Sequence, residues 1–225
     1  MSLRSTDGLI RFGLLALPLA GLLALVGLYS TLQLGSGGIL ATGENRALVS
    51  TGYFMSVFLG NMLALTVLIF GVMALYAYLA NSRQRALTLG AMVLSVFGIA
   101  LTLSTVGVNA YAIPALSRSY LNGRTESIRI LDYIFAGPLE AMSTLVFLLY
   151  SAGFILFGVA IWRSGALPRW SGVLVAAHAP LISGPFSVVG SVVGALLALA
   201  GGGWIALSAL QSPTGQARPP RRPRA

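Results

Sequence analysis

Uncharged apolar stretches alternate with short, arginine-bearing connectors along this chain. The pattern predicts an all-α membrane bundle of six transmembrane helices, at residues 12–34, 53–79, 86–113, 138–162, 170–184 and 186–210. About 20 helical residues, each rising about 1.5 Å, cross the ~30 Å hydrocarbon core of a bilayer. All of the predicted spans exceed this length except residues 170–184. We expect residues 1–211 to form one transmembrane domain.

Prolines set several of the expected helix ends. We expect Pro114 to end the third span, because proline lacks the amide hydrogen that continues a helix. The fourth span is expected to begin at Pro138, since the missing N–H costs nothing at the first helical position. Residues 170–217 carry no charge, and a single helix of that length would measure roughly 70 Å. We therefore expect Pro180 and Pro185 to divide this stretch into two spans.

The first apolar stretch has two interpretations. It follows a short polar head with Arg4 and Arg11, which is also how a signal peptide begins. The apolar run exceeds the roughly 7–15 residues of a signal-peptide core, and no small-residue cleavage site follows it. We expect an uncleaved helix that Pro18 kinks, with a cleaved signal peptide as the alternative.

The composition identifies lipid as the solvent of this fold. Only 8% of the residues are charged and 56% are hydrophobic, with a mean hydropathy of +0.87. Soluble domains carry about 25% charged residues, so this chain cannot cover a water-exposed surface, and the lipid bilayer is its expected partner. The sequence holds neither cysteine nor lysine. Their absence excludes disulfides, thiol chemistry and lysine Schiff-base chemistry.

The net charge of +9 orients the protein rather than indicating a nucleic-acid partner. With six spans, both termini lie on one side with the connectors after the second and fourth spans. That side carries ten of the fourteen arginines, namely Arg4, Arg11, Arg83, Arg85, Arg163, Arg169, Arg218, Arg221, Arg222 and Arg224. Positive charge favours the cytoplasmic side. We expect a multi-pass protein of the bacterial cytoplasmic (inner) membrane with both termini in the cytoplasm.

The C-terminal tail, residues 212–225, alternates proline with arginine and lacks any apolar pattern that could pack. We expect it to be disordered and cytoplasmic. Each arginine near a membrane surface contributes about 1 kcal/mol of attraction to anionic lipid headgroups. The tail is therefore a candidate for headgroup binding, although fixing the topology is the simpler role.

Three polar residues within or next to apolar spans are candidates for ligand binding: Glu140, His178 and Asn61. Ionisable and polar groups are costly in a membrane and often functional. Each also has a structural explanation. Glu140 lies in the first turn of its helix, where a carboxylate complements the helix dipole. His178, the only histidine, and Asn61 could each form a hydrogen bond to a neighbouring helix.

Small residues recur every four positions in the last predicted span, at Gly190, Gly194, Ala198 and Gly202. Such a stripe lets two helix backbones approach closely in lipid. We expect the stripe to pack against other helices of the same chain. A homo-oligomer or a contact with another membrane protein is the alternative.

Leu167, Pro168, Arg169 and Trp170 open the fifth predicted span after a polar outer loop before the fourth. This architecture and these four residues resemble a family of uncharacterised bacterial six-helix integral membrane proteins, a domain of unknown function. The resemblance implies no substrate and no catalytic residue. Physically, Arg169 can meet lipid headgroups while Trp170 lies in the aromatic belt, so both are expected to be interface anchors.

The sequence contains no catalytic pattern that we recognise. One histidine cannot supply the paired axial ligands of a di-haem cytochrome or a histidine-rich metal site, and no phosphate-binding loop is present. We expect no catalytic residue, cofactor or metal, and a non-enzymatic binding, accessory or regulatory role.

Two other functions stay open. The first is a small-molecule transporter or the substrate-binding subunit of an importer. Six helices with an alanine face at Ala16, Ala20 and Ala24 resemble the substrate-capture subunits of vitamin importers, which dock on a partner through small-residue faces. The second is a membrane-embedded enzyme acting on lipid, which would need a polar pocket around Glu140.

Overall fold

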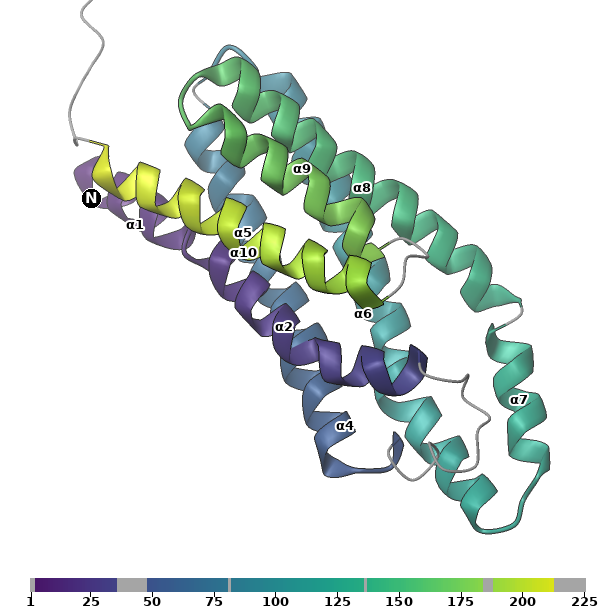
Figure 1. Cartoon of the computed structure of the whole chain (residues 1–225). Helices are drawn as coiled ribbons and strands as arrows, with labels where there is room; N and C mark the ends of the chain where they lie inside the picture. The colour runs from purple at the N-terminus through teal and green to yellow at the C-terminus, as the bar shows by residue number, and fades with distance from the viewer. Residues whose placement is uncertain (1–2, 36–47, 81, 136, 184–187, 213–225) are drawn as a thin grey trace, which may run out of the picture.

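The computed structural model describes residues 3–35, 48–80, 82–135, 137–183 and 188–212. These residues form helices joined by short turns, and none of them lies in a β-strand. The elements are α1 (Leu3–Gly13), α2 (Ala16–Gly35), α4 (Thr51–Met55), η1 (Ser56–Leu63), α5 (Ala64–Leu79), α6 (Arg85–Leu121), α7 (Glu126–Phe135), α8 (Pro138–Ser164), α9 (Arg169–Ser183) and α10 (Val188–Gln211) (Figure 1). The prediction of an all-α fold is confirmed for this part of the chain.

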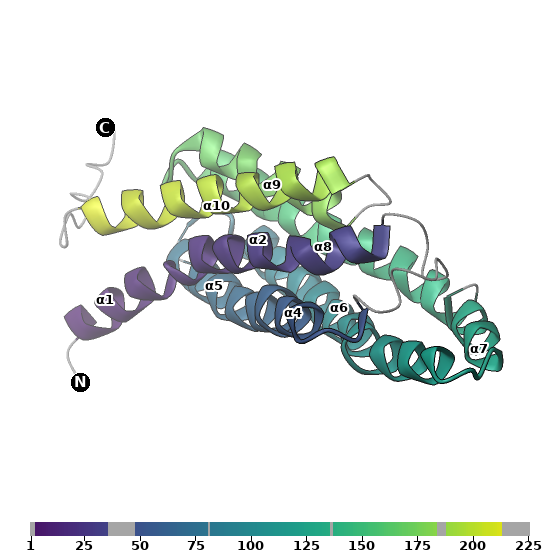
Figure 2. The ribbon, with the colours of Figure 1, turned by 60° about the horizontal axis from the view of Figure 1, so that its bottom comes forward.

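The long helices form a closed ring. Going round it, α2 packs on η1 and α5, these pack on α6, α6 on α8, α8 on α9, α9 on α10, and α10 again on α2. The start of α1 and the end of α10 lie together at one end of the bundle (Figure 2). There the Arg11 guanidinium donates a hydrogen bond to the Ser212 carbonyl. The ring order therefore follows the chain order, with the last helix closing on the first.

Pro18 breaks the first predicted span into two helices. The interruption falls at Leu14 and Leu15, between α1 and α2. Pro18 cannot donate to the carbonyl of Leu14 four residues earlier, and its ring crowds that carbonyl. The Leu14 carbonyl instead accepts from the Leu17 amide at 3.1 Å, a tighter turn. The expected kink is thus present, and α1 runs beside the end of α10 (Figure 1).

The second span is helical from Thr51 to Leu79 but not α-helical throughout. Ser50 caps its start by accepting a hydrogen bond from the Tyr53 amide at 3.1 Å. The middle segment, η1, is a π-helix over Ser56–Leu63. π-Helical turns are rare and occur often at functional sites. The sequence pattern did not indicate this change of helix type.

One boundary prediction based on proline is wrong. The third span does not end at Ile113, because α6 continues through Pro114 to Leu121. The expected fifth span, residues 170–184, lies within one residue of α9 at each end, and Pro180 lies inside that helix without ending it. Helices in lipid tolerate proline where neighbouring groups satisfy the freed backbone. The Tyr53 hydroxyl donates to the Asn109 carbonyl at 3.1 Å, next to the carbonyl that Pro114 leaves without its helical donor.

The remaining boundaries follow local sequence signals. Pro138 occupies the start of α8, as predicted. Gly165 ends the same helix with a left-handed backbone, φ +62°, a conformation that other residues adopt at a cost. The end of α6 and α7 extend beyond the ring (Figure 1). Three parts of the chain lie outside the described residues: the predicted tail beyond Ser212, residues 36–47 with Glu44 and Arg46, and residues 184–187, where the predicted sixth span begins.

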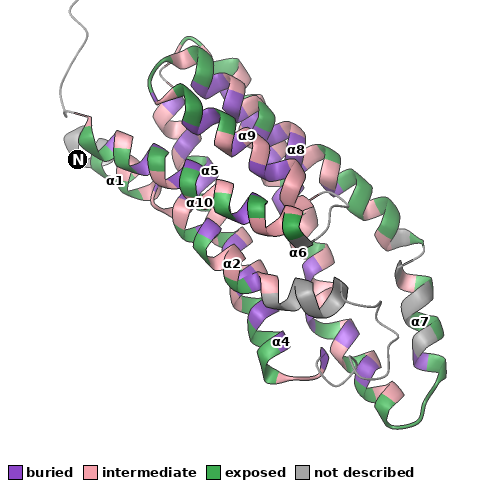
Figure 3. Ribbon diagram, in the orientation of Figure 1, coloured by how far each residue is buried: buried purple, intermediate pink, exposed green. Residues whose placement is uncertain are grey.

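The outer surface of the ring is apolar. Large hydrophobic side chains are exposed along α5, α6 and α10, including Phe70, Phe97 and Leu207 (Figure 3). Phe154, Phe157 and other large side chains fill the contacts between helices. Within the part of the chain that the structure describes, five helical segments are long and apolar enough to cross a membrane: Gly8–Leu28, Thr51–Leu79, Arg85–Leu121, Leu139–Ser164 and Val189–Gln211. The protein is therefore built for a membrane.

Glycines mark the closest contacts between the ring helices. A Cβ atom added to Gly60 of η1 would lie 2.0 Å from the Gly27 nitrogen of α2. A Cβ on Gly98 of α6 would lie 2.7 Å from the Tyr150 backbone of α8, and one on Gly158 would lie 2.6 Å from the Gly172 carbonyl oxygen of α9. Backbones that pack this closely increase van der Waals contact, which drives helix association in lipid.

The predicted small-residue stripe of α10 meets two different neighbours within the chain. A Cβ on Gly194 would lie 2.6 Å from the Ile182 side chain of α9, whereas one on Gly202 would lie 2.9 Å from Leu17 of α2. Ala198 lies between them and faces the interior of the ring. Gly190 is half-buried. Gly194 and Gly202 thus lie against different helices of the same ring.

Candidate ligand-binding cavity

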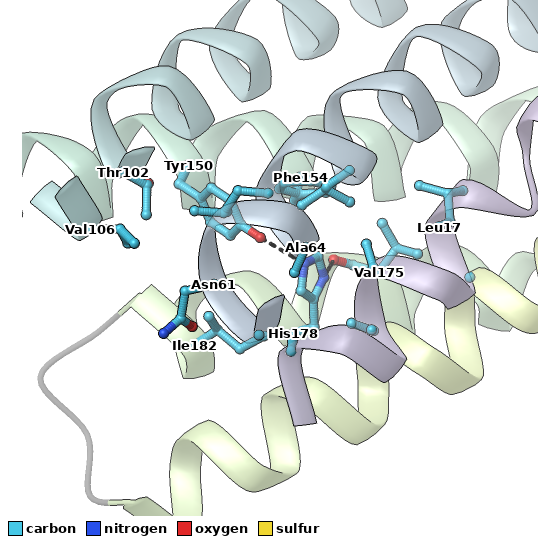
Figure 4. Close-up of a pocket in the computed structure, with 18 residues that line it drawn as sticks. Leu17, Asn61, Ala64, Thr102, Val106, Tyr150, Phe154, Val175, His178 and Ile182 are labelled. Carbon is cyan, nitrogen blue, oxygen red and sulfur yellow. Dashed lines mark hydrogen bonds between the residues drawn. The ribbon is translucent and has the colours of Figure 1, made fainter. Parts of the chain in front are cut away.

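A cavity of about 200 Å³ lies inside the ring. Every segment of the ring contributes to its wall (Figure 4). The wall includes Ala20 and Ala24 of α2, Asn61 of η1, Ala64 of α5, Thr102 of α6, Tyr150 and Phe154 of α8, His178 of α9 and Ala198 of α10. For comparison, an apolar cavity of ~150 Å³ in another protein binds benzene. The cavity can therefore accommodate a small organic molecule.

His178 is fixed on the cavity wall by two hydrogen bonds. It is 3% exposed. Its Nδ1 bonds to the carbonyl of Val175, one turn earlier on α9. Its Nε2 lies 3.4 Å from the Tyr150 hydroxyl of α8 (Figure 4). Because a carbonyl only accepts, Nδ1 carries the proton, so Nε2 of the neutral ring accepts from Tyr150.

Aromatic packing restricts the imidazole further. Phe154 lies one turn after Tyr150 on the same face of α8 and meets the His178 ring edge-on, with centroids 4.6 Å apart. Tyr150 itself meets the same ring at 6.0 Å. Edge-to-face arrangements of this kind are favourable. The side chains of α8 therefore hold the position of the imidazole, whereas the Val175 carbonyl of α9 sets its tautomer.

Asn61 reaches the cavity from the π-helical segment. Its side-chain oxygen lies close to α2, since a Cβ on Gly27 would be 2.6 Å from Asn61 Oδ1. The neighbouring Ser56 hydroxyl donates to the Val26 carbonyl of α2 at 2.9 Å. These contacts join η1 to α2 where the two backbones are closest. Asn61 and His178, both candidates from the sequence, thus line one cavity (Figure 4).

Glu140, the third candidate, does not line the cavity. It is exposed in the first turn of α8, ten residues before Tyr150, which is roughly 15 Å along the helix. In that position a carboxylate complements the positive end of the helix dipole. The structure therefore separates Glu140 from the other two candidate residues.

The predicted interface anchors lie at the turn between α8 and α9. Trp170 is 64% exposed, and the Arg169 guanidinium lies 5.8 Å from the ring centre of Trp162, a cation–π contact. The two tryptophans meet edge-on at 6.0 Å. An exposed group of two indoles and an arginine suits the headgroup region of a membrane. Trp162 completes this group and was not among the sequence-predicted anchors.

No charged side chain lines the cavity among the described residues. The Ser151 hydroxyl contacts the Ser183 hydroxyl at 3.3 Å, and His178 Nε2 has the Tyr150 hydroxyl as its hydrogen-bond partner. Within the described ranges, no group of three or more histidine, aspartate or glutamate residues lies close enough to hold a metal ion. The arrangement can bind and orient a neutral molecule.

Sequence reasoning missed Tyr150, Thr102 and Phe154 as cavity residues. A signal existed in the spacing of Tyr150 and Phe154, which places two aromatic rings on one face of a helix. Tyrosine and phenylalanine are common in this chain, so spacing alone did not distinguish them from core residues.

Comparisons with protein-family models, with curated proteins and with solved structures found no match to this chain. The resemblance carried by Leu167, Pro168, Arg169 and Trp170 stays a prediction. Function is therefore argued from the geometry of the cavity and the chemistry of its wall.

Proposed function

We propose that this protein is a non-enzymatic membrane protein that binds a small, largely apolar molecule in the cavity enclosed by its helical ring. The observation that carries the proposal is the wall of the cavity. It takes residues from all the segments of the ring and contains one oriented tyrosine–histidine pair in an otherwise mostly apolar lining. Small-molecule sites combine apolar walls with a few placed polar groups in this way.

The proposed topology has six spans and places both termini in the cytoplasm of a bacterial cell. The helix α9 has 15 residues, about 22 Å of rise, yet it occupies a full place in the ring between α8 and α10. Among the described residues, the end that holds the start of α1 and the end of α10 carries one acidic residue, Asp7, and six arginines, namely Arg4, Arg11, Arg83, Arg85, Arg163 and Arg169. At the opposite end, Arg118, Arg124 and Arg129 are accompanied by Glu126, Asp132 and Glu140. This asymmetry supports the orientation.

Single cysteines test this topology, because the natural chain has none. We expect a membrane-impermeant thiol reagent to label Asn122→Cys on intact cells and Ala166→Cys only after permeabilisation. Both positions are exposed in turns, and Ala166 avoids the left-handed Gly165. Labelling of Ala166→Cys alone on intact cells would invert the topology. Equal labelling of both positions on intact cells would contradict the single span, α8, that separates the two turns.

The binding proposal predicts a co-purifying molecule that depends on the cavity. Ala64 is 6% exposed and lines the cavity, so Ala64→Leu should fill part of it. We expect solvent extracts of the purified wild-type protein to contain a small molecule that is reduced at least severalfold in Ala64→Leu. Mass spectrometry of the two extracts makes the measurement.

The matched control is Thr66→Leu on the same helix, because Thr66 is exposed on the outer face. This variant adds a similar apolar side chain outside the cavity, and its extract should match that of the wild-type protein. Identical extracts from all three proteins, in material purified without added ligands, would argue against an occupied cavity.

The two alternative functions lose part of their support. Ala20 and Ala24 line the cavity, so the alanine face of the first span is not available to dock a partner subunit. Glu140 lies away from the cavity, and a lipid-cleaving site around it would have to be built from other residues. A binding role makes use of the cavity without either requirement.

A further inference from the structure

The polar group that suits a ligand depends on which hydrogen-bond donors of the cavity wall are already used and which acceptors remain. The Tyr150 hydroxyl has one hydrogen, which points to His178 Nε2 because Nδ1 already holds the ring proton. The Tyr150 oxygen keeps its capacity to accept. The contact between Tyr150 and His178 measures 3.4 Å, which is long compared with the usual ~2.8 Å for a hydroxyl donor. A ligand can therefore still form a hydrogen bond to the Tyr150 oxygen.

Thr102 of the neighbouring helix α6 also offers a hydrogen-bond acceptor to the cavity. Its hydroxyl donates to the Gly98 carbonyl, one turn earlier on α6, at 2.7 Å. Its only hydrogen is therefore used within the helix, and its oxygen can accept from the cavity side. Two hydroxyl oxygens from two different helices thus offer acceptors. The side-chain amide of Asn61 carries both donors and an acceptor, so the excess of acceptors on the wall comes from Tyr150 and Thr102.

Charge and size restrict the ligand further. The cavity wall has no carboxylate to pair with a cation and no arginine to pair with an anion among the described residues. A charged ligand without a partner would pay a large desolvation cost in this environment. A volume of about 200 Å³ is somewhat larger than the ~150 Å³ that holds benzene. The wall therefore suits a neutral molecule of one or two rings, or a branched chain of similar size.

We propose that the ligand is a small, neutral, apolar compound with one hydroxyl or N–H group, which donates a hydrogen bond to the Tyr150 oxygen. Phenols, indoles and short terpene alcohols belong to this class. The inference rests on the proposed binding function and adds the polarity of the ligand. Tyr150 acts as the specificity-determining residue, and His178 positions its hydroxyl by accepting the only hydrogen.

The test compares p-cresol with p-xylene, in which a methyl group replaces the hydroxyl at similar size. Binding is followed by nitrogen NMR on protein labelled with ¹⁵N-histidine, in which His178 gives the only signals. Parallel titrations of Ala64→Leu correct for partition of each compound into detergent. We expect p-cresol to bind about two- to tenfold more tightly than p-xylene, the range for one net hydrogen bond. The Nε2 resonance should shift on binding while Nδ1 keeps its proton.

Tyr150→Phe keeps the ring and removes the acceptor, so this variant should bind p-cresol and p-xylene with about equal affinity. Equal affinities of the wild-type protein for the two probes would overturn the donor inference and leave cavity binding intact. No difference between the wild-type protein and Ala64→Leu with either probe would count against the binding function itself. A preference unchanged in Tyr150→Phe would assign recognition to another residue and overturn the role of Tyr150.

A second comparison uses the wild-type protein alone, so the test does not depend on the folding of the variant. The probe 4-methylanisole has the p-cresol ring with its donor capped by a methyl group. It should bind more weakly than p-cresol by a similar two- to tenfold factor. An affinity at least as high as that of p-cresol would overturn the proposal.

Discussion

Gly98→Ala is expected to lower the thermal stability of the purified protein, whereas Gly107→Ala on the same helix is not. The Cβ atom of alanine at position 98 would lie 2.7 Å from both the nitrogen and the Cα of Tyr150. Backbone atoms cannot move aside as a flexible side chain does, so α6 and α8 must separate. Forcing extra volume into a well-packed contact costs about 1–3 kcal/mol. The expected result is a melting temperature several degrees lower in detergent.

Gly107 supplies the control, because an added Cβ there meets nothing within 4 Å. Replacing a helical glycine with alanine in open space removes backbone entropy from the unfolded chain and stabilises by roughly 0.5–1 kcal/mol. The two variants should therefore shift the melting temperature in opposite directions. Equal shifts would show that α6 and α8 are not packed through Gly98, and the position of Tyr150 in the cavity would have to be revised.

The helices of this protein were predictable because apolar length alone determines a membrane span. The observed starts at Arg85 and Pro138 lie within one residue of the predicted ones. Proline was a poor guide to the ends, for a physical reason. Pro18 interrupts its helix, whereas α6 and α9 continue through Pro114 and Pro180. Whether a freed carbonyl finds another donor depends on neighbouring helices, and the sequence does not specify those neighbours.

The candidate site was predictable in part. Asn61 and His178 were identifiable because polar side chains are rare inside apolar spans, and both line the cavity. Tyr150 was not, since its role depends on a histidine 28 positions away on the next helix. Glu140 was selected by the same polarity criterion and lies elsewhere. A single sequence shows which residues are unusual for their environment but not which of them the fold brings together.

The close contacts between helices were likewise predictable from the sequence only in part. The four-residue repeat of α10 was visible in the sequence, and Gly194 and Gly202 do lie against neighbouring helices. The tightest contact on the ring, between Gly27 and Gly60, joins two glycines on different spans. Gly60 belongs to a four-residue repeat of small residues, Gly52, Ser56, Gly60 and Ala64, but the repeat does not show that Gly27 is its partner. Periodicity detects a stripe on one helix, whereas pairing between helices depends on their rotation and depth.

Phe97→Arg is expected to have the largest effect of any substitution on the outer surface. Phe97 is 63% exposed and lies twelve residues after the start of α6, roughly 18 Å into the helix. On a soluble protein, an arginine at such an exposed position would change stability by about 0.5 kcal/mol or less. In a bilayer, an arginine near the centre of a span costs about 2.5–3.5 kcal/mol on insertion scales. We expect Phe97→Arg to lose most of the membrane-integrated, folded protein.

Leu89→Arg is the matched control for depth. Leu89 is 43% exposed on the same helix and lies four residues after its start, roughly 6 Å along. An arginine there can extend its side chain to the headgroups, so the cost should be much smaller. The measurement is the fraction of each variant that resists alkaline extraction and elutes as a folded species in detergent. Wild-type yields for both variants would mean that this face of α6 meets water or a partner protein rather than lipid. The exposed apolar ring would then be an interaction surface.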